Sequence, residues 1–257
     1  MKKLCLLIPL ITGLLFSFMS FSQSSSFYTA AKSGLSLREN PAIDAKVIDK
    51  IPYGTKITLL TTDEEKKTIV TEGMEGSWEK VKYNNKTGYV INSYLFPLPP
   101  PKLATVKEMK NYLAQVTTAF GARLVTKSGA TDNSEGFGWE LRKQLYKNGA
   151  EHHEFIGYEY NSNTYFLPDF SLEQGFLLLR LIPEFKELFG EKDEFPSSSK
   201  KYVKGETEYE VTVYKRVFDA DHSWIDKIRI EYAEGAVYFF EMYLLDNQLV
   251  IFYSAGL

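Results

Sequence analysis

The sequence predicts a mainly β protein of the α+β class, in which a small all-β domain precedes a domain with helices packed on an antiparallel sheet. Aromatic residues make up 15% of the 257 residues, with 18 Phe and 17 Tyr, a composition typical of strand-rich domains. Strand-like runs between turn residues continue as far as Phe96 without helical periodicity. Helical patterns and further hairpin signals appear only after it, and helices segregated from hairpins indicate the α+β class.

Residues 1–22 have the pattern of a secretory signal peptide. Lys2-Lys3 forms a charged start, an apolar run follows over residues 4–19, and Ser20-Phe21-Ser22 places small residues where a signal peptidase reads them. We expect cleavage before Gln23 and an exported protein, periplasmic or extracellular, without a transmembrane anchor. An uncleaved anchor is the alternative, but it needs about 20 continuous apolar residues, and this run is shorter.

The mature chain has no cysteine, because Cys5 is the only one in the sequence and lies near the start of the apolar run rather than at its end, where a lipidated cysteine would have to lie. Its cores must therefore stabilise it without disulfides.

Of the 30 Lys and Arg, Lys2 and Lys3 leave with the signal, so 28 basic side chains remain against 33 acidic ones, a net charge of −5. Without a Lys/Arg-rich stripe, nucleic acid is excluded as a partner.

A proline run, Pro97-Leu98-Pro99-Pro100-Pro101, marks the clearest boundary in the chain. Stacked prolines fix φ, donate no backbone hydrogen bonds and favour a stiff polyproline II spacer. We therefore expect a linker at residues 97–104 and a second domain, of the α+β class and of unknown function, at residues 105–257.

Two capping boxes predict two helices in this second domain. Thr105-Val106-Lys107-Glu108 opens a helix expected to reach about residue 120, and Ser171-Leu172-Glu173-Gln174 opens a second, more buried helix. In a capping box, two side chains satisfy backbone N–H groups that have no partner inside the helix. Pro183 should kink the second helix, or restart it as a short helix that ends near Gly190.

The other segments of the second domain predict strands. Residues 139–167 alternate like strands, with a hairpin turn at Asn148-Gly149 and a second turn at Asn161-Ser162-Asn163. The polar stretch from 128 to 138 is predicted as a loop. The end of the chain predicts an antiparallel meander over residues 208–218, 224–232, 236–245 and 248–254.

Three sequence blocks between Phe27 and Phe96 carry a family resemblance. They are Ser33-Gly34-Leu35-Ser36-Leu37-Arg38-Glu39-Asn40-Pro41, then residues 47–57 around Pro52-Tyr53-Gly54, and finally Trp78-Glu79-Lys80-Val81-Lys82 with Thr87-Gly88-Tyr89-Val90 and Tyr94-Leu95. In this order they resemble the bacterial SH3 (SH3b) family, which implies a small SH3-like β-barrel over residues 27–96.

The apolar residues fit such a barrel. Leu35 with Leu37, Val47 with Ile48 and Ile51, Ile57 with Leu59, and Val81 with Tyr83 can line its interior. Gly54 and Gly88 fall where a turn needs positive φ or where two backbones approach closely. Two features depart from the family pattern: Ser36 stands in the place of its usual asparagine, and residues 61–77 form a long charged insertion beside the usual ligand groove.

The resemblance implies a binding function, because such domains attach envelope proteins to cell-wall peptides or to other proteins. Tyr53, Trp78, Tyr89 and Tyr94 are the candidate ligand-binding residues, since each can present a ring to a ligand. Aromatic residues in so small a barrel are also frequent in the core, and that alternative stays open.

We find no catalytic residues, no cofactor and no metal in the sequence pattern. A cysteine peptidase needs a thiolate nucleophile, and the mature chain has none. A zinc site needs about three converging ligands, but His152 and His153 are adjacent in a predicted strand and point to opposite faces, and His222 is the only other histidine.

Two acidic patterns offer weaker alternatives. Asp219, Asp221, Ser223 and Asp226 resemble the start of a calcium loop, but the glycine and glutamate that such a loop needs are missing, and a polar hairpin turn is the simpler interpretation. Glu206-Thr207-Glu208-Tyr209-Glu210 places three carboxylates on one face of a strand. They could act on a glycan, but a solvated sheet face also explains them.

The sequence therefore predicts an exported, non-enzymatic envelope protein whose SH3b barrel binds a cell-wall peptide or an envelope protein. The alternative is a cell-envelope hydrolase with its active site in residues 105–257.

Overall fold

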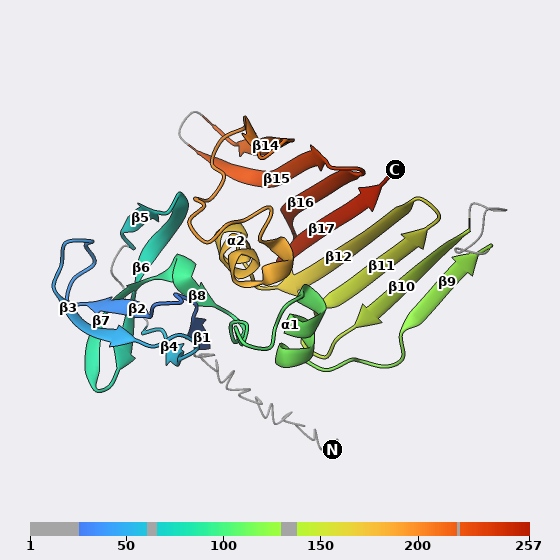
Figure 1. The fold of residues 1–257 in the computed structure, drawn as a ribbon. Helices are drawn as coiled ribbons and strands as arrows, with labels where there is room; N and C mark the ends of the chain where they lie inside the picture. Colours follow the sequence, from blue (N-terminus) through green and yellow to red (C-terminus); the bar gives the residue numbers. More distant parts are fainter. Residues whose placement is uncertain (1–25, 61–65, 130–137, 220–221) are drawn as a thin grey trace, which may run out of the picture.

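The computed structural model describes residues 26–60, 66–129, 138–219 and 222–257. Within these ranges a small β-barrel, a layer of helices and a large antiparallel sheet follow one another, with helix α2 (Leu172–Leu181) between the barrel and the sheet (Figure 1). Most of the described chain is strand, and the helices lie on one face of the large sheet. The predicted mainly β, α+β class is confirmed.

The barrel contains two small sheets, with strand orders β4-β1-β8 and β3-β2-β7-β6-β5. Its elements are β1 (Ser26–Thr29), β2 (Leu35–Arg38), β3 (Val47–Ile51), β4 (Lys56–Thr58), β5 (Thr68–Thr71), β6 (Met74–Tyr83), β7 (Lys86–Ile91), the 3₁₀ turn η1 (Asn92–Tyr94) and β8 (Leu95–Phe96). All pairings between these strands are antiparallel. The insertion at 61–77 contributes β5 and the start of β6, and its residues 61–65 lie outside the described part.

The interior of the barrel follows the sequence prediction except at one position. Leu35, Leu37, Ile51, Ile57 and Val81 lie in its core, with Ile48, Leu59 and Tyr83 packed against them. Val47, also predicted to line the interior, is 46% exposed, because the register of β2 and β3 shifts next to its partner Arg38.

The two glycines act as predicted. Gly54 adopts a φ of 76° in a turn, and a Cβ on Gly88 would lie 2.5 Å from the carbonyl oxygen of Arg38. Any larger residue at Gly88 would push the neighbouring strand β2 away.

The first helix is shorter than predicted, and its predicted cap is not formed. Helix α1 spans Met109–Val116 with Glu108 as its N-cap residue, so the helix predicted over 105–120 begins four residues late and ends early. The backbone N–H of Met109 donates to the carboxylate of Glu184, 2.8 Å away, while the carboxylate of Glu108 pairs with Lys110. A side chain 75 residues further along thus replaces the local capping box.

The second helix begins as the sequence predicts. At the start of α2, the hydroxyl of Ser171 accepts from the N–H of Gln174, and the Gln174 side chain accepts from the N–H of Ser171. The helix stops at Leu181, and Pro183 opens the short 3₁₀ helix η2 (Pro183–Phe185). The predicted break before Pro183 is confirmed.

The large sheet has the strand order β13-β14-β15-β16-β17-β12-β11-β10-β9 within the described residues, all antiparallel. Its strands are β9 (Leu124–Ser128), β10 (Trp139–Leu145), β11 (Glu151–Gly157), β12 (Tyr160–Pro168), β13 (Lys200–Lys204), β14 (Thr207–Val217), β15 (Ser223–Ala233), β16 (Val237–Leu245) and β17 (Gln248–Gly256). The predicted meander is confirmed as β14 to β17. Strands β9 and β13 at the two edges were not predicted, and of the loop predicted over 128–138, residues 130–137 lie outside the described part.

The turn predicted at Asn161-Ser162-Asn163 is wrong. These residues lie in β12, paired with β11 on one side and β17 on the other, and the chain reverses at Tyr158-Glu159. Pairing on both sides satisfies the backbone in an extended conformation, which outweighs the turn preference of asparagine and serine.

One hydrophobic core joins the barrel to the rest of the chain. The cluster around α2 and the large sheet includes Ala30, Met74 and Phe96 of the barrel, all 0% exposed. The ring of Phe96 packs 5.4 Å from that of Phe170, and the side chain of Gln174 donates to the backbone oxygen of Leu95. The barrel is therefore packed onto the helix layer.

The proline segment is packed in the same way. Pro100 and Pro101 are buried, and their carbonyl oxygens accept from Gln115 at 3.0 Å and from the hydroxyl of Tyr53 at 2.8 Å. Because α1 and the barrel both bind it, this segment is a fixed strap rather than a free, solvated spacer. The division of the chain into domains at 97–104 stays a prediction.

Candidate functional site

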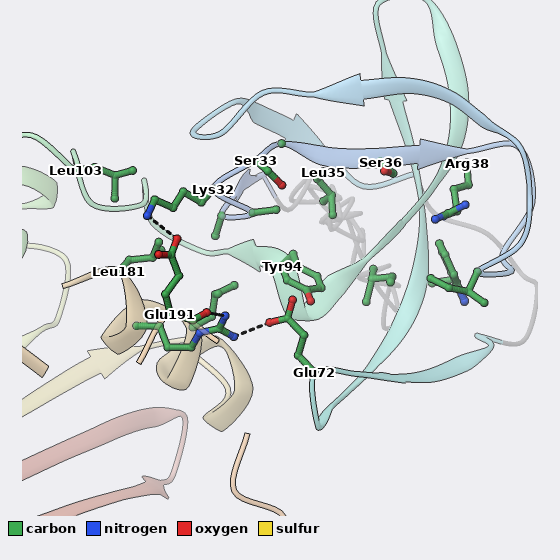
Figure 2. Close-up of a pocket in the computed structure, with 18 residues that line it drawn as sticks. Lys32, Ser33, Leu35, Ser36, Arg38, Glu72, Tyr94, Leu103, Leu181 and Glu191 are labelled. Atoms are coloured by element: carbon green, nitrogen blue, oxygen red, sulfur yellow. Dashed lines mark hydrogen bonds and ion pairs between the residues drawn. The ribbon is translucent and has the colours of Figure 1, made fainter. Parts of the chain in front are cut away.

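The candidate site is a groove between the barrel and α2, which we call the barrel–helix groove. It has a volume of about 500 Å³. Residues 30–36, Arg38 and Ile43 of the barrel line one side, and Leu177, Arg180 and Leu181 of α2 line the other, with Leu103 and Glu191 at the rim (Figure 2). Both the barrel and the second half of the chain are needed to form it.

Two of the four predicted ligand-binding residues lie in this groove. Trp78 of β6 and Tyr94 of η1 line it together with Leu35 and Ile91. Trp78 is only 5% exposed, so it forms part of the groove's apolar floor. Tyr94 packs against the barrel core and the shared core, and burial raises the pKa of its hydroxyl to about 12, with the Glu72 carboxylate adding to the effect. Its hydroxyl therefore stays protonated and can donate a hydrogen bond at neutral pH.

Two ion pairs cross from the barrel to the second half of the chain at the groove. Lys32 Nζ lies 2.7 Å from Glu191 Oε1, and Arg180 Nη1 lies 2.5 Å from Glu72 Oε2. The Arg180 side chain is only 12% exposed, and it also donates to the backbone oxygen of Glu191 and lies over the ring of Phe176. Arg180 is thus held in place, whereas Lys32 and Glu191 are 54% and 73% exposed and can pair with other groups.

The other two predicted residues lie elsewhere. The Tyr53 hydroxyl binds the backbone of the proline segment, so its role in the structure is to hold that segment. Tyr89 lies on β7 with Lys80 Nζ 5.6 Å from its ring centroid, and it does not line the groove. The structure therefore brings Trp78 and Tyr94 together and leaves Tyr53 and Tyr89 apart from them.

The second wall of the groove was not found from the sequence. Leu177, Arg180 and Leu181 recur three and four residues apart, so they share one face of α2. That spacing indicates a common face, but nothing local indicates that the barrel packs opposite it. Lys32, Ile43 and Glu191 lie in connecting segments that carry no recognisable pattern.

The three histidines do not converge. His152 is buried, stacks on Tyr165 at 4.3 Å and binds the side-chain oxygen of Asn163, whereas the adjacent His153 pairs with Glu151. His222 pairs with Asp219 at 2.7 Å, far along the sheet. Within the described ranges, no group of three His, Cys, Asp or Glu is placed to hold a metal ion.

Most acidic side chains of the two patterns form hydrogen bonds or ion pairs with other residues of the chain. Asp219 accepts from the backbone of His222, and Asp226 pairs with Arg216 at 3.0 Å; Asp221 lies outside the described residues. Glu208 and Glu210 are exposed on β14 and pair with Lys201. Glu206 is exposed in the turn before β14. These contacts fit the polar hairpin and the solvated sheet face that the sequence also allows.

The side chains that line the groove can bind a ligand. Its lining contains no histidine and no cysteine, and its two carboxylates, Glu72 and Glu191, each pair with a cation. An apolar floor with a tyrosine hydroxyl and charges of both signs at the rim fits a short peptide, which offers side chains, backbone groups and charged termini. In the described part of the chain, no helix has the length and apolarity needed to cross a membrane.

Comparison with known proteins identifies the barrel but not the remainder of the chain. Neither curated proteins nor solved structures gave a match. Residues 33–96, which carry the sequence blocks and most of the barrel wall of the groove, match the bacterial SH3 domain family.

Proposed function

We propose that this chain is an exported, non-enzymatic envelope protein that binds a cell-wall peptide or an envelope protein in the barrel–helix groove. The bacterial SH3 match supports a binding role associated with the cell wall. The observation that carries the proposal is the position of Trp78 and Tyr94, which both line the barrel–helix groove.

The groove's contacts suggest which peptide it accepts. Ile43 and Leu103 are 58% and 37% exposed at its rim, so an apolar ligand side chain would cover surface that is now in water. Lys32 and Glu191, exposed and paired, can exchange partners with a ligand carboxylate and amine at small cost. A short peptide that carries charges of both signs and small apolar side chains fits these groups.

Co-sedimentation with purified peptidoglycan tests this proposal. Ile43→Asp places a charge on the groove rim at an exposed position, so it should weaken binding without unfolding the barrel. Val203→Asp is the matched control, because Val203 is 66% exposed on the edge strand β13, away from the groove. We expect the wild type and Val203→Asp to sediment with peptidoglycan and Ile43→Asp to stay in solution. Equal sedimentation of all three would contradict a role for the groove.

A further inference from the structure

The face of the large sheet that points away from the helices has an unusual composition. Helices α1 and α2 lie on the same side of the sheet (Figure 1), and a Cβ on Gly175 of α2 would contact Leu249 and Met242 of that side. Side chains alternate between the two faces of a strand, so the neighbours of these two residues in sequence point to the other face. An antiparallel sheet with one solvated face normally carries mostly polar residues there.

Large aromatic rings occupy this outer face instead. We call it the aromatic face and define it by Trp139, Phe155, Phe166, Phe239 and Phe252, each of them half-buried. The rings form contacts across strands: Trp139 stacks on Phe155 at 6.2 Å, and Phe239 meets Phe252 edge-on at 6.0 Å. The face therefore extends from β10 to β16.

Small polar residues lie between the rings. Ser162 and Ser254 are buried although neither lies on the helix side, which means that the neighbouring rings cover them. Strand register places Phe239, Ser254, Ser162 and Phe155 in one row across β16, β17, β12 and β11. With strands about 4.8 Å apart, the rings at the two ends of this row are separated by about 14 Å.

The next row carries hydrogen-bonding groups. Register places Glu241, Phe252, Thr164, His153 and Lys143 side by side on five neighbouring strands. A carboxylate, a hydroxyl, an imidazole and an amine therefore border the row of rings. Flat aromatic rings beside hydrogen-bond donors and acceptors match a pyranose chain, whose ring faces present C–H groups and whose edges present hydroxyls.

The charges on this face disfavour other occupants. A second copy packed face to face would bury Lys227 and Glu241, which pair at 2.8 Å and keep 30% and 17% of their side-chain surface in water. Arg229 lies over the ring of Phe239, 4.1 Å from its centroid, and would also lose solvent. Burying such charges costs several kcal/mol each, so a dry sheet-to-sheet or lipid contact is disfavoured. A hydroxylated polymer keeps them solvated or hydrogen-bonded.

We propose that the aromatic face binds a neutral, linear polysaccharide, with sugar rings stacked on the aromatic rings and hydroxyls bound by the row from Glu241 to Lys143. This site is separate from the barrel–helix groove and does not depend on the function proposed for that groove.

Affinity electrophoresis and calorimetry with chito-oligosaccharides and cello-oligosaccharides test the proposal. Trp139→Ala should weaken binding about tenfold or more, because losing one stacked ring costs on the order of 1.4 kcal/mol. His153→Ala removes one hydrogen-bonding group without removing a large ring and should also weaken binding. Phe218→Ala is the control, since Phe218 is 79% exposed at the tip of the β14–β15 hairpin.

Each outcome decides between the aromatic face and its alternatives. Binding that is weakened by both face variants but retained in Phe218→Ala and in Ile43→Asp supports the proposal. No binding of either sugar series by the wild type overturns it, as does binding that only Ile43→Asp removes. A wild-type dimer that Trp139→Ala converts to a monomer would show that the face is covered by a second copy, and would also overturn the proposal.

Discussion

Replacement of Phe96 by alanine should destabilise the whole chain and not the barrel alone. Phe96 ends the barrel sequence, is 0% exposed and packs on Phe170 in the core that it shares with α2 and the large sheet. A buried Phe→Ala change costs about 3–5 kcal/mol, which is a large part of the 5–15 kcal/mol typical of a folded domain. We therefore expect a lower denaturation midpoint with a single transition.

Urea denaturation followed by hydrogen exchange and mass spectrometry measures this effect in both halves at once. Peptides from the barrel and from the large sheet should lose protection together in the wild type, and together at lower urea in Phe96→Ala. Val237→Ala, at a position that is 55% exposed, should change stability by no more than about 0.5 kcal/mol. The reasoning would be refuted if the sheet peptides kept their wild-type midpoint in Phe96→Ala while the barrel unfolded.

Three further predictions concern helix packing, pH and export. Gly175→Ala should lower the free energy of unfolding by about 1–3 kcal/mol, because its Cβ would lie 2.4 Å from Leu249 Cδ2 in a packed interior. An unchanged midpoint in a urea titration would show that Leu249 moves freely. Burial lowers the pKa of His152, so the unfolded chain takes up a proton first and stability should fall as the pH drops below about 6.5. His152→Phe should flatten this part of the profile of melting temperature against pH. An unaltered slope would show that other titratable groups cause the loss of stability. Mass spectrometry of the exported protein should find Gln23 as the first residue, whereas a membrane-bound chain that begins at Met1 would restore the anchor interpretation.

Local patterns predicted the elements whose stabilising contacts lie close in sequence. The capping box of α2 pairs Ser171 with a residue three positions away, and the barrel blocks form hairpins between neighbouring strands. The last four strands are joined by short turns, and each pairs with the strand that follows it. In such cases the residues that decide the structure lie within one window of the sequence.

The predictions were wrong where the local structure depends on residues far away in the sequence. The cap of α1 comes from Glu184, and the strand at Asn161-Ser162-Asn163 depends on β17, almost a hundred residues further on. The groove is the same kind of case. Trp78 and Tyr94 could be chosen as aromatic residues of a barrel, but Arg180 enters the site only because α2 packs against that barrel. Single-sequence patterns carry no information on such long-range contacts.

Titration of a single-tryptophan variant with soluble cell-wall stem peptides tests the central claim most directly. Replacing Trp139 and Trp224 by phenylalanine leaves Trp78 as the only tryptophan of the chain, and Trp78 lies in the floor of the barrel–helix groove. We predict a saturable change in Trp78 fluorescence that Ile43→Asp removes and Val203→Asp leaves intact. The claim would be contradicted if calorimetry showed peptide binding while the fluorescence of Trp78 stayed constant and Ile43→Asp bound with wild-type affinity.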